Sequence, residues 1–377
     1  MSKRPPRSTP ISVPDAERFA ALARGVFDSG VLTNNGPKAR ELETRLADYL
    51  GVEHLVLTSS GTLALQVAYR ALGLTGEVIT SPFSWTTTAS SLCWVGLQPR
   101  FADIDPSTFN LDPRGIEGEI NQNTSAVLAV HTFGNPCDVA GIERIAHRHG
   151  LRTVYDAAHA FGVGYADKSV FAFGDASVLS LHATKLFHTV EGGAVILRDA
   201  ETCERARLIV NNGADEEQEV LALGINGRMS ELHAAVGLTL LDNADGVLRR
   251  RRVLAQALRE QLRKSSSVQL QRLNTSARVN HAYFPVVFPR TELRQRAIEA
   301  LDAAGFKSRV YFANPLNRLP FIERPQPMPV TESLCCRILC LLLGPEASSD
   351  EVRQMGQIVA SICPLNQTPA APAQARS

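Results

Sequence analysis

Residues 179–195, LSLHATKLFHTVEGGAV, place a single lysine between two apolar segments. The first segment ends near Ser180, and the second begins after Glu191-Gly192-Gly193. Burial of an ammonium group is costly and lowers its pKa, so Lys185 needs either a partner or a chemical role. From its position alone, a structural ion pair or a side chain that reaches solvent is the alternative. The other lysines lie in polar segments: Lys3, Lys38, Lys168, Lys264 and Lys307.

The segments around this stretch alternate between strand and helix patterns. A short apolar run at 54–60 leads directly into helical spacing at 61–74, and similar pairs recur as far as 193–199. Short β-branched runs separated by helical stretches predict parallel strands with crossover helices, which is an α/β fold. We expect four parts: a disordered arm at 1–12, a large sheet domain at 13–245, a smaller C-terminal α+β domain at 246–364 and a disordered tail at 365–377.

Composition excludes several classes of protein. The chain has 377 residues, of which 44% are hydrophobic, but no window approaches the ~18 to 20 uninterrupted apolar residues of a membrane span. A net charge of +1 argues against a general nucleic-acid surface. The seven cysteines lack C-x-x-C spacing, which favours reduced, buried thiols. The basic N-terminus has no apolar segment behind it, unlike a signal peptide, so we expect a cytoplasmic protein.

Polar residues stand at the expected carboxyl ends of the strands, where ligands bind in open α/β sheets. Ser59-Ser60-Gly61-Thr62 joins a strand to a helix, a pattern that suits a phosphate but also an ordinary helix cap. Asp156 closes another strand, and His159 follows it. Neither residue has a metal-ligand companion at useful spacing, and the chain lacks the G-x-G-x-x-G and P-loop patterns.

Together these residues match the needs of one cofactor. Pyridoxal 5′-phosphate (PLP) requires a lysine for its Schiff base, an acid against its pyridine nitrogen, a ring to stack on and donors for its phosphate. Lys185, Asp156, Trp85 and Ser180 supply these groups. The residues therefore predict a PLP enzyme.

Many ordered motifs resemble the DegT/StrS family of nucleotide-sugar aminotransferases, which are PLP enzymes of fold type I. The motifs are GP-x-A-x-x-LE at 36–43, SSGTLAL at 59–65, EVITSPFSWTTTAS at 77–90, FADID at 101–105, VHTFGNPCD at 130–138, YDAAHAFG at 155–162, SLHATKLFHTVEGGAV at 180–195 and GINGRMSELHAAVG at 224–237. The resemblance covers roughly residues 30–240 and continues more weakly through 310–320.

The resemblance implies a role for each matching residue. Lys185 would carry the cofactor and move the substrate proton, and Asp156 would pair with the pyridinium nitrogen. The other implied cofactor contacts are His159 near the phenolic side of the ring, Trp85 stacked on it, Gly61, Thr62 and Ser180 at the phosphate, and Asn226 reaching the phosphate from a second subunit of a homodimer. Relatives often have P-L-H where this chain has Pro315-Leu316-Asn317, a departure that bears on the donor or sugar side.

The implied reaction is ping-pong transfer of an amino group from L-glutamate to a nucleotide-linked keto sugar. The motifs look most like enzymes that aminate dTDP-4-keto-6-deoxyglucose at C4, with amination at C3 as the runner-up. A PLP-dependent sugar dehydratase is a second alternative. Some relatives that eliminate water carry histidine in place of the lysine, so the presence of Lys185 favours the aminotransferase. A binding or regulatory protein that keeps the fold is the third, but loss of activity would be expected to erode the complete cofactor set.

Overall fold

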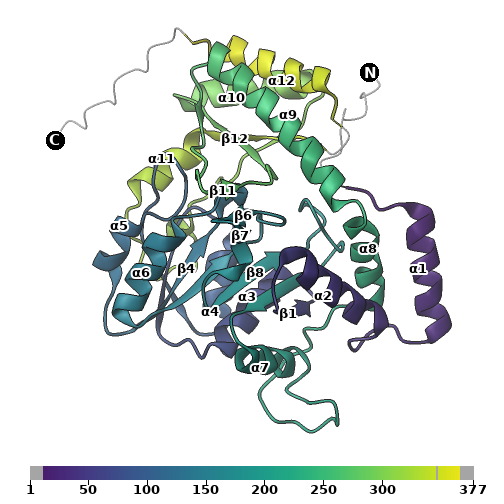
Figure 1. Ribbon diagram of the computed structural model, residues 1–377. Coiled ribbons are helices and arrows are strands. Elements are labelled where there is room, and N and C mark those ends of the chain that lie inside the picture. The colour runs from purple at the N-terminus through teal and green to yellow at the C-terminus, as the bar shows by residue number, and fades with distance from the viewer. Residues whose placement is uncertain (1–11, 345–346, 366–377) are drawn as a thin grey trace.

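The computed structural model describes residues 12–344 and 347–365, and its core is a seven-stranded sheet (Figure 1). The predicted disordered arm and tail lie almost wholly outside the described residues. Neighbouring strands are parallel except β9, which is antiparallel to both β1 and β8. The strand order is β1 (His54–Thr58), β9 (Gly193–Leu197), β8 (Ala176–Ser180), β5 (Arg152–Asp156), β4 (Thr124–Val130), β2 (Glu77–Thr80) and β3 (Gln98–Phe101).

The reversed direction of β9 follows from its connection to β8. Residues 181–192 join the two strands without a helix, whereas a parallel neighbour needs a long crossover. This connection is the segment that carries Lys185, so the lysine lies on a loop at the carboxyl end of β8. The predicted α/β fold is confirmed, with one strand that runs against the others.

Helices cover both faces of the sheet because side chains alternate along each strand. In β1, Leu55 and Leu57 join one core cluster, while Val56 joins the cluster on the opposite face. One face packs against α3 (Gly61–Ala71), α4 (Thr86–Trp94) and α7 (Ala200–Val210). The other packs against α2 (Pro37–Leu50), α5 (Pro113–Ile116), α6 (Val139–His149) and α8 (Glu231–Leu241), with α1 (Ala16–Ser29) outside α8.

The C-terminal part forms a second, antiparallel sheet at the top of Figure 1. Leu254, Leu258 and Leu262 repeat every four residues on one face of α9 and pack into its core. The strands are β10 (Gln269–Leu270), β12 (Phe284–Val287), β14 (Ile338–Leu341) and β13 (Ser308–Arg309); the helices are α9 (Ala244–Ser265), α10 (Thr291–Ala303), α11 (Pro329–Arg337) and α12 (Ser349–Ile362).

A small sheet joins the two parts. Its strands are β11 (Ala277–Arg278), β6 (Gly164–Tyr165) and β7 (Lys168–Ser169), so a C-terminal strand pairs with a hairpin of the large part. The predicted boundary between residues 245 and 246 falls in the first turn of α9. Within the described residues, every helix is too short or too polar to cross a membrane.

The cysteines were predicted to be buried, but two of them are not. All seven are free thiols, and Cys93 and Cys336 are exposed. Cys335 and Cys336 are neighbours on helix α11, where successive side chains point in different directions. Only Cys335 can therefore face the core.

Candidate active site

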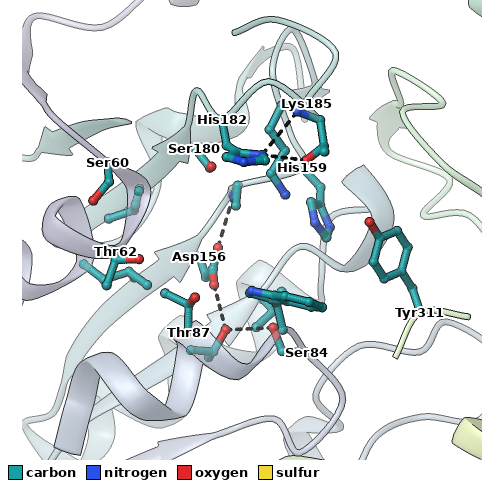
Figure 2. Close-up of a pocket in the computed structure, with 18 of the residues that line it drawn as sticks. Ser60, Thr62, Ser84, Thr87, Asp156, His159, Ser180, His182, Lys185 and Tyr311 are labelled. Atoms are coloured by element: carbon teal, nitrogen blue, oxygen red, sulfur yellow. Dashed lines mark hydrogen bonds between the residues drawn. The ribbon is translucent and has the colours of Figure 1, made fainter. Parts of the chain in front are cut away.

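A cavity of about 310 Å³ opens where the carboxyl ends of the strands meet the C-terminal part. It is lined by every predicted site residue except Asn226. Figure 2 shows the side chains of Asp156, His159, Ser180 and Lys185 directed toward one space. The strand ends thus bring together residues that are up to 124 positions apart in the chain (185 − 61).

Lys185 lies half-buried in the wall of this cavity. Its backbone N–H donates to the carbonyl of His182 at 2.8 Å, and its ammonium lies 6.0 Å from the centre of the Tyr283 ring. Burial lowers the pKa of Lys185 to about 8, and the attraction of Asp156 only partly opposes this shift. Lys38 and Lys307 pair with carboxylates, but Lys185 forms no ion pair within the described part of the chain. The ion-pair alternative is therefore not what the structure shows.

Asp156 ends β5 with its carboxylate held by two donors. Oδ2 accepts a hydrogen bond from Thr88 Oγ1 at 2.9 Å, and Oδ1 accepts one from the backbone of Ala158 at 3.2 Å. Burial raises the pKa of Asp156, while these hydrogen bonds and the charge of Lys185 lower it. The carboxylate thus has a fixed orientation in a poorly solvated place.

His159 is held as a neutral imidazole in the wall of the same cavity. Its Nδ1 accepts a hydrogen bond from the backbone N–H of Phe133 at 3.3 Å, so the proton resides on Nε2. The ring lies parallel to Phe133 and Phe312, and burial lowers the pKa of His159 well below its ordinary value. A neutral ring with one N–H can donate a hydrogen bond into the cavity without adding charge.

The start of α3 forms a tight corner against β8 and β9. A Cβ on Gly61 would lie 2.9 Å from Ser180 Cβ, and a Cβ on Gly193 would lie 2.6 Å from the carbonyl carbon of Ser60. Glycine at both positions therefore allows the backbones to approach. The Ser60 side chain caps the helix by accepting from Leu63 N–H, so the ordinary cap proposed for this motif is present.

The remaining hydroxyls at this corner are free. Thr62 and Ser180 line the cavity, and their hydroxyl groups make no hydrogen bond with the described residues. Free hydroxyls beside a helix N-terminus form an anion-binding arrangement, because the helix N–H groups carry partial positive charge. The corner can hold a phosphate group.

Trp85 supplies an aromatic wall at the mouth of the cavity. It occupies the N-cap position of α4, is 58% exposed and meets Tyr311 edge-to-face at 6.3 Å between ring centres. An exposed indole beside a cavity offers a face for a flat ligand.

The family assignment comes from the whole chain. The model of the DegT/DnrJ/EryC1/StrS aminotransferase family matches residues 14–360. The chain belongs to this family. The predicted family, fold type and transaminase class are confirmed.

This DegT/DnrJ/EryC1/StrS aminotransferase is similar to two bacterial transaminases over nearly its full length. It is 38% identical over 352 residues to the dTDP-4-amino-4,6-dideoxy-D-glucose transaminase of Shigella dysenteriae, which covers 90% of this chain and 94% of the relative. It is 34% identical to the Escherichia coli transaminase of the same name, over 92% of this chain and 96% of that protein.

Solved structures give the same result. The crystal structure of DesI in the presence of its TDP-sugar product matches with a TM-score of 0.89 at 36% identity, covering 96% of this chain and 94% of DesI. The similarity therefore extends through the C-terminal part, where the sequence motifs were weak.

The C-terminal part of this aminotransferase contributes cavity residues that the sequence did not predict. These residues, which line the cavity, are Tyr283, Arg309, Tyr311 and Phe312. Arg309 donates a hydrogen bond to the Tyr311 hydroxyl at 2.8 Å. These residues lie in segments without a distinctive pattern. The weak motif at 310–320 was the one signal that could have pointed to Tyr311 and Phe312.

Asn226 and Asn317 lie away from the cavity of their own chain. Asn226 is exposed and follows the loop after α7, which Figure 1 shows extending from the body of the molecule. Asn317 is fully buried and donates to the Gln326 carbonyl and the Glu332 carboxylate. Asn317, which stands where relatives often have the histidine of P-L-H, is thus hydrogen-bonded within the C-terminal part.

Proposed function

We propose that this aminotransferase uses PLP to transfer an amino group from L-glutamate to a nucleotide-linked keto-deoxy sugar, and that it aminates dTDP-4-keto-6-deoxyglucose at C4 in deoxyamino-sugar biosynthesis. The proposal rests on the half-buried Lys185, which shares its cavity with Asp156 and with the corner at the start of α3 that can hold a phosphate. The names of the two transaminase relatives and the TDP-sugar product named with DesI support the choice of sugar.

The cavity residues fit the cofactor on chemical grounds. The unpaired hydroxyls of Thr62 and Ser180, with Gly61 at the start of α3, would hold its phosphate, and Trp85 would stack on its ring. Asp156 would face the ring nitrogen, and His159 would lie near the phenolic side of the ring. When bound, PLP supplies an electron sink for the bonds at the amino-bearing carbon.

Lys185 would both attach the cofactor and move the substrate proton. A lysine with a pKa of about 8 is partly neutral near physiological pH, whereas one at ~10.4 is almost fully protonated. The neutral amine is the nucleophile and the base. Burial of the side chain therefore prepares it for both tasks.

We also propose a homodimer with shared active sites. The loop after α7 exposes Val220, Leu221 and Leu223, the last at 85%, and an apolar loop of this kind suits a subunit interface. Asn226 lies three residues after Leu223. Across a twofold axis, it would reach the phosphate corner of the partner chain.

A cytoplasmic location remains a prediction, in keeping with seven free cysteines.

Absorption spectra test the proposal. Purified protein should carry the absorption band of a lysine-bound PLP, and glutamate should convert it to the band of the amine form. Lys185→Ala should bind PLP but show neither the lysine-bound band nor its conversion by glutamate. In the wild-type protein, borohydride reduction should fix the cofactor on the peptide that contains Lys185. A spectrum that glutamate leaves unchanged would favour a binding protein. Products from a panel of 4-keto and 3-keto sugars would separate C4 from C3 amination, and loss of water would indicate a dehydratase.

A further inference from the structure

A buried chain of hydroxyl groups leads from helix α4 to Asp156. Ser84 Oγ lies 2.7 Å from Thr88 Oγ1, and Thr88 Oγ1 donates to Asp156 Oδ2 at 2.9 Å; Figure 2 draws both contacts. Ser84 is 3% exposed, Thr88 0% and Asp156 6%. Neither hydroxyl makes another hydrogen bond with the described residues, so both are committed to the carboxylate.

The direction of the chain follows from counting protons. A threonine hydroxyl has one hydrogen. When Asp156 is ionised, Thr88 gives that hydrogen to the carboxylate, and Ser84 must then donate to Thr88. The bond from Thr88 to the ionised carboxylate is charge-assisted, and the bond from Ser84 strengthens it because hydrogen bonds in series polarise one another. The arrangement favours the ionised form of Asp156 over the protonated form.

Thr88 is itself held rigidly. It lies in the first turn of α4, where its backbone N–H donates to the Trp85 carbonyl at 3.0 Å. A β-branched side chain in a helix has restricted rotamers. The Ala158 N–H fixes the other carboxylate oxygen. Each oxygen of Asp156 therefore accepts one hydrogen bond from the described residues and keeps one lone pair for a ligand.

We infer that Thr88, supported by Ser84, is a positioning residue that keeps Asp156 ionised and aimed at the ring nitrogen of the bound cofactor. The inference rests on the proposed function, because the ring nitrogen is the group that needs this charge. Neither residue was predicted from the sequence, although both lie in the motif at 77–90.

Few other groups can take over this role. Burial raises the pKa of Asp156, whereas the hydrogen bonds from Thr88 and Ala158 N–H and the charge of Lys185 lower it. Tyr69 is a further titratable group close enough to feel the charge of Asp156, and His159 lies in the same cavity. Burial raises the pKa of Tyr69 and lowers the pKa of His159, so both side chains stay neutral. Thr88 is the side chain within the described residues that donates a hydrogen bond to this carboxylate, whatever the charge on Lys185.

The test is nitrogen-15 NMR of the holoenzyme loaded with ring-labelled PLP. Thr88→Val keeps the shape of the side chain and removes the donor, so the ratio of protonated to neutral ring nitrogen should fall about tenfold or more. Thr88→Ser should restore the wild-type ratio. Thr239→Val is a matched control, because Thr239 is a buried threonine of α8 that donates to Ala235 O at 2.9 Å.

Two further variants keep the result decisive. Ser84→Ala should shift the ratio in the same direction by a smaller factor, and it serves if Thr88→Val does not fold. The double variant Ser84→Ala/Thr88→Val should resemble Thr88→Val. If the double variant instead recovers the wild-type ratio, the cause is an unpaired Ser84 hydroxyl and the inference is wrong.

Failure of the inference is distinct from failure of the proposed function. A Thr88→Val ratio within about twofold of wild type, or an equal shift in Thr239→Val, would overturn the inference while wild-type PLP binding stands. Absence of PLP bound at Lys185 in the wild type would instead overturn both.

Discussion

Replacement of Lys185 by methionine should stabilise the cofactor-free protein. In the folded state burial holds the pKa of Lys185 at about 8, against ~10.4 for an exposed lysine in the unfolded chain. Below about pH 8 the folded protein must hold a proton on a poorly solvated amine. Methionine fills similar space against the Tyr283 ring and carries no charge.

The magnitude follows from linkage. A depression from ~10.4 to about 8 corresponds to roughly 3 kcal/mol of lost stability near pH 7. Because the side chain is partly open to the cavity, we expect Lys185→Met to gain about 1–3 kcal/mol. Between about pH 8 and 10.4 the unfolded state binds the extra proton, so wild-type stability rises with pH in this window. The advantage of the variant should therefore shrink and vanish above about pH 10.5.

Urea unfolding of both cofactor-free proteins at one protein concentration measures this difference. Lys307→Met is the control, because Lys307 is 57% exposed in its side chain and pairs with Asp302. Its stability should change by less than about 1 kcal/mol with no such dependence on pH. If Lys185→Met is less stable than wild type near neutral pH, or its gain does not decline with pH, Lys185 is not a desolvated amine and the explanation of its reactivity fails.

Three further experiments test the cavity. Gly61→Ala puts a methyl group 2.9 Å from Ser180 Cβ and should cost ~1–3 kcal/mol in unfolding free energy; an unchanged value would mean that the corner is not tight. Asp156→Asn should keep the fold but lower turnover by orders of magnitude. Near-normal turnover would mean that another acid pairs with the ring nitrogen of the cofactor. Inactive Lys185→Ala and Asn226→Glu chains, once exchange is demonstrated, should recover up to about a quarter of wild-type activity when mixed. No recovery would contradict the shared site.

The sequence was sufficient for the part of the site that lies at strand ends. Asp156 ends its apolar strand, whereas Gly61 and Lys185 follow β1 and β8 by three and five residues. These three strands are parallel, so their carboxyl ends lie at one edge of the sheet. Local pattern and one topological rule were therefore enough to group them. The direction of β9 was not predictable in this way, because an apolar run reads the same in either direction.

Contacts that depend on tertiary packing could not be predicted. Tyr283 and Arg309 reach the cavity because the C-terminal sheet packs over the strand ends, and no local pattern records that placement. The Thr88–Asp156 hydrogen bond joins residues 68 apart in the chain. The role of Asn226 stays a prediction for a related reason, since it requires a second chain.

The most direct test of the central claim is mass spectrometry of the sugar product. Wild-type protein, PLP, nitrogen-15-labelled L-glutamate and dTDP-4-keto-6-deoxyglucose should yield an amino sugar that carries the label at C4, and Lys185→Ala should yield none. If the wild-type protein leaves the 4-keto sugar unchanged while a related transaminase converts it under the same conditions, the proposed reaction is wrong.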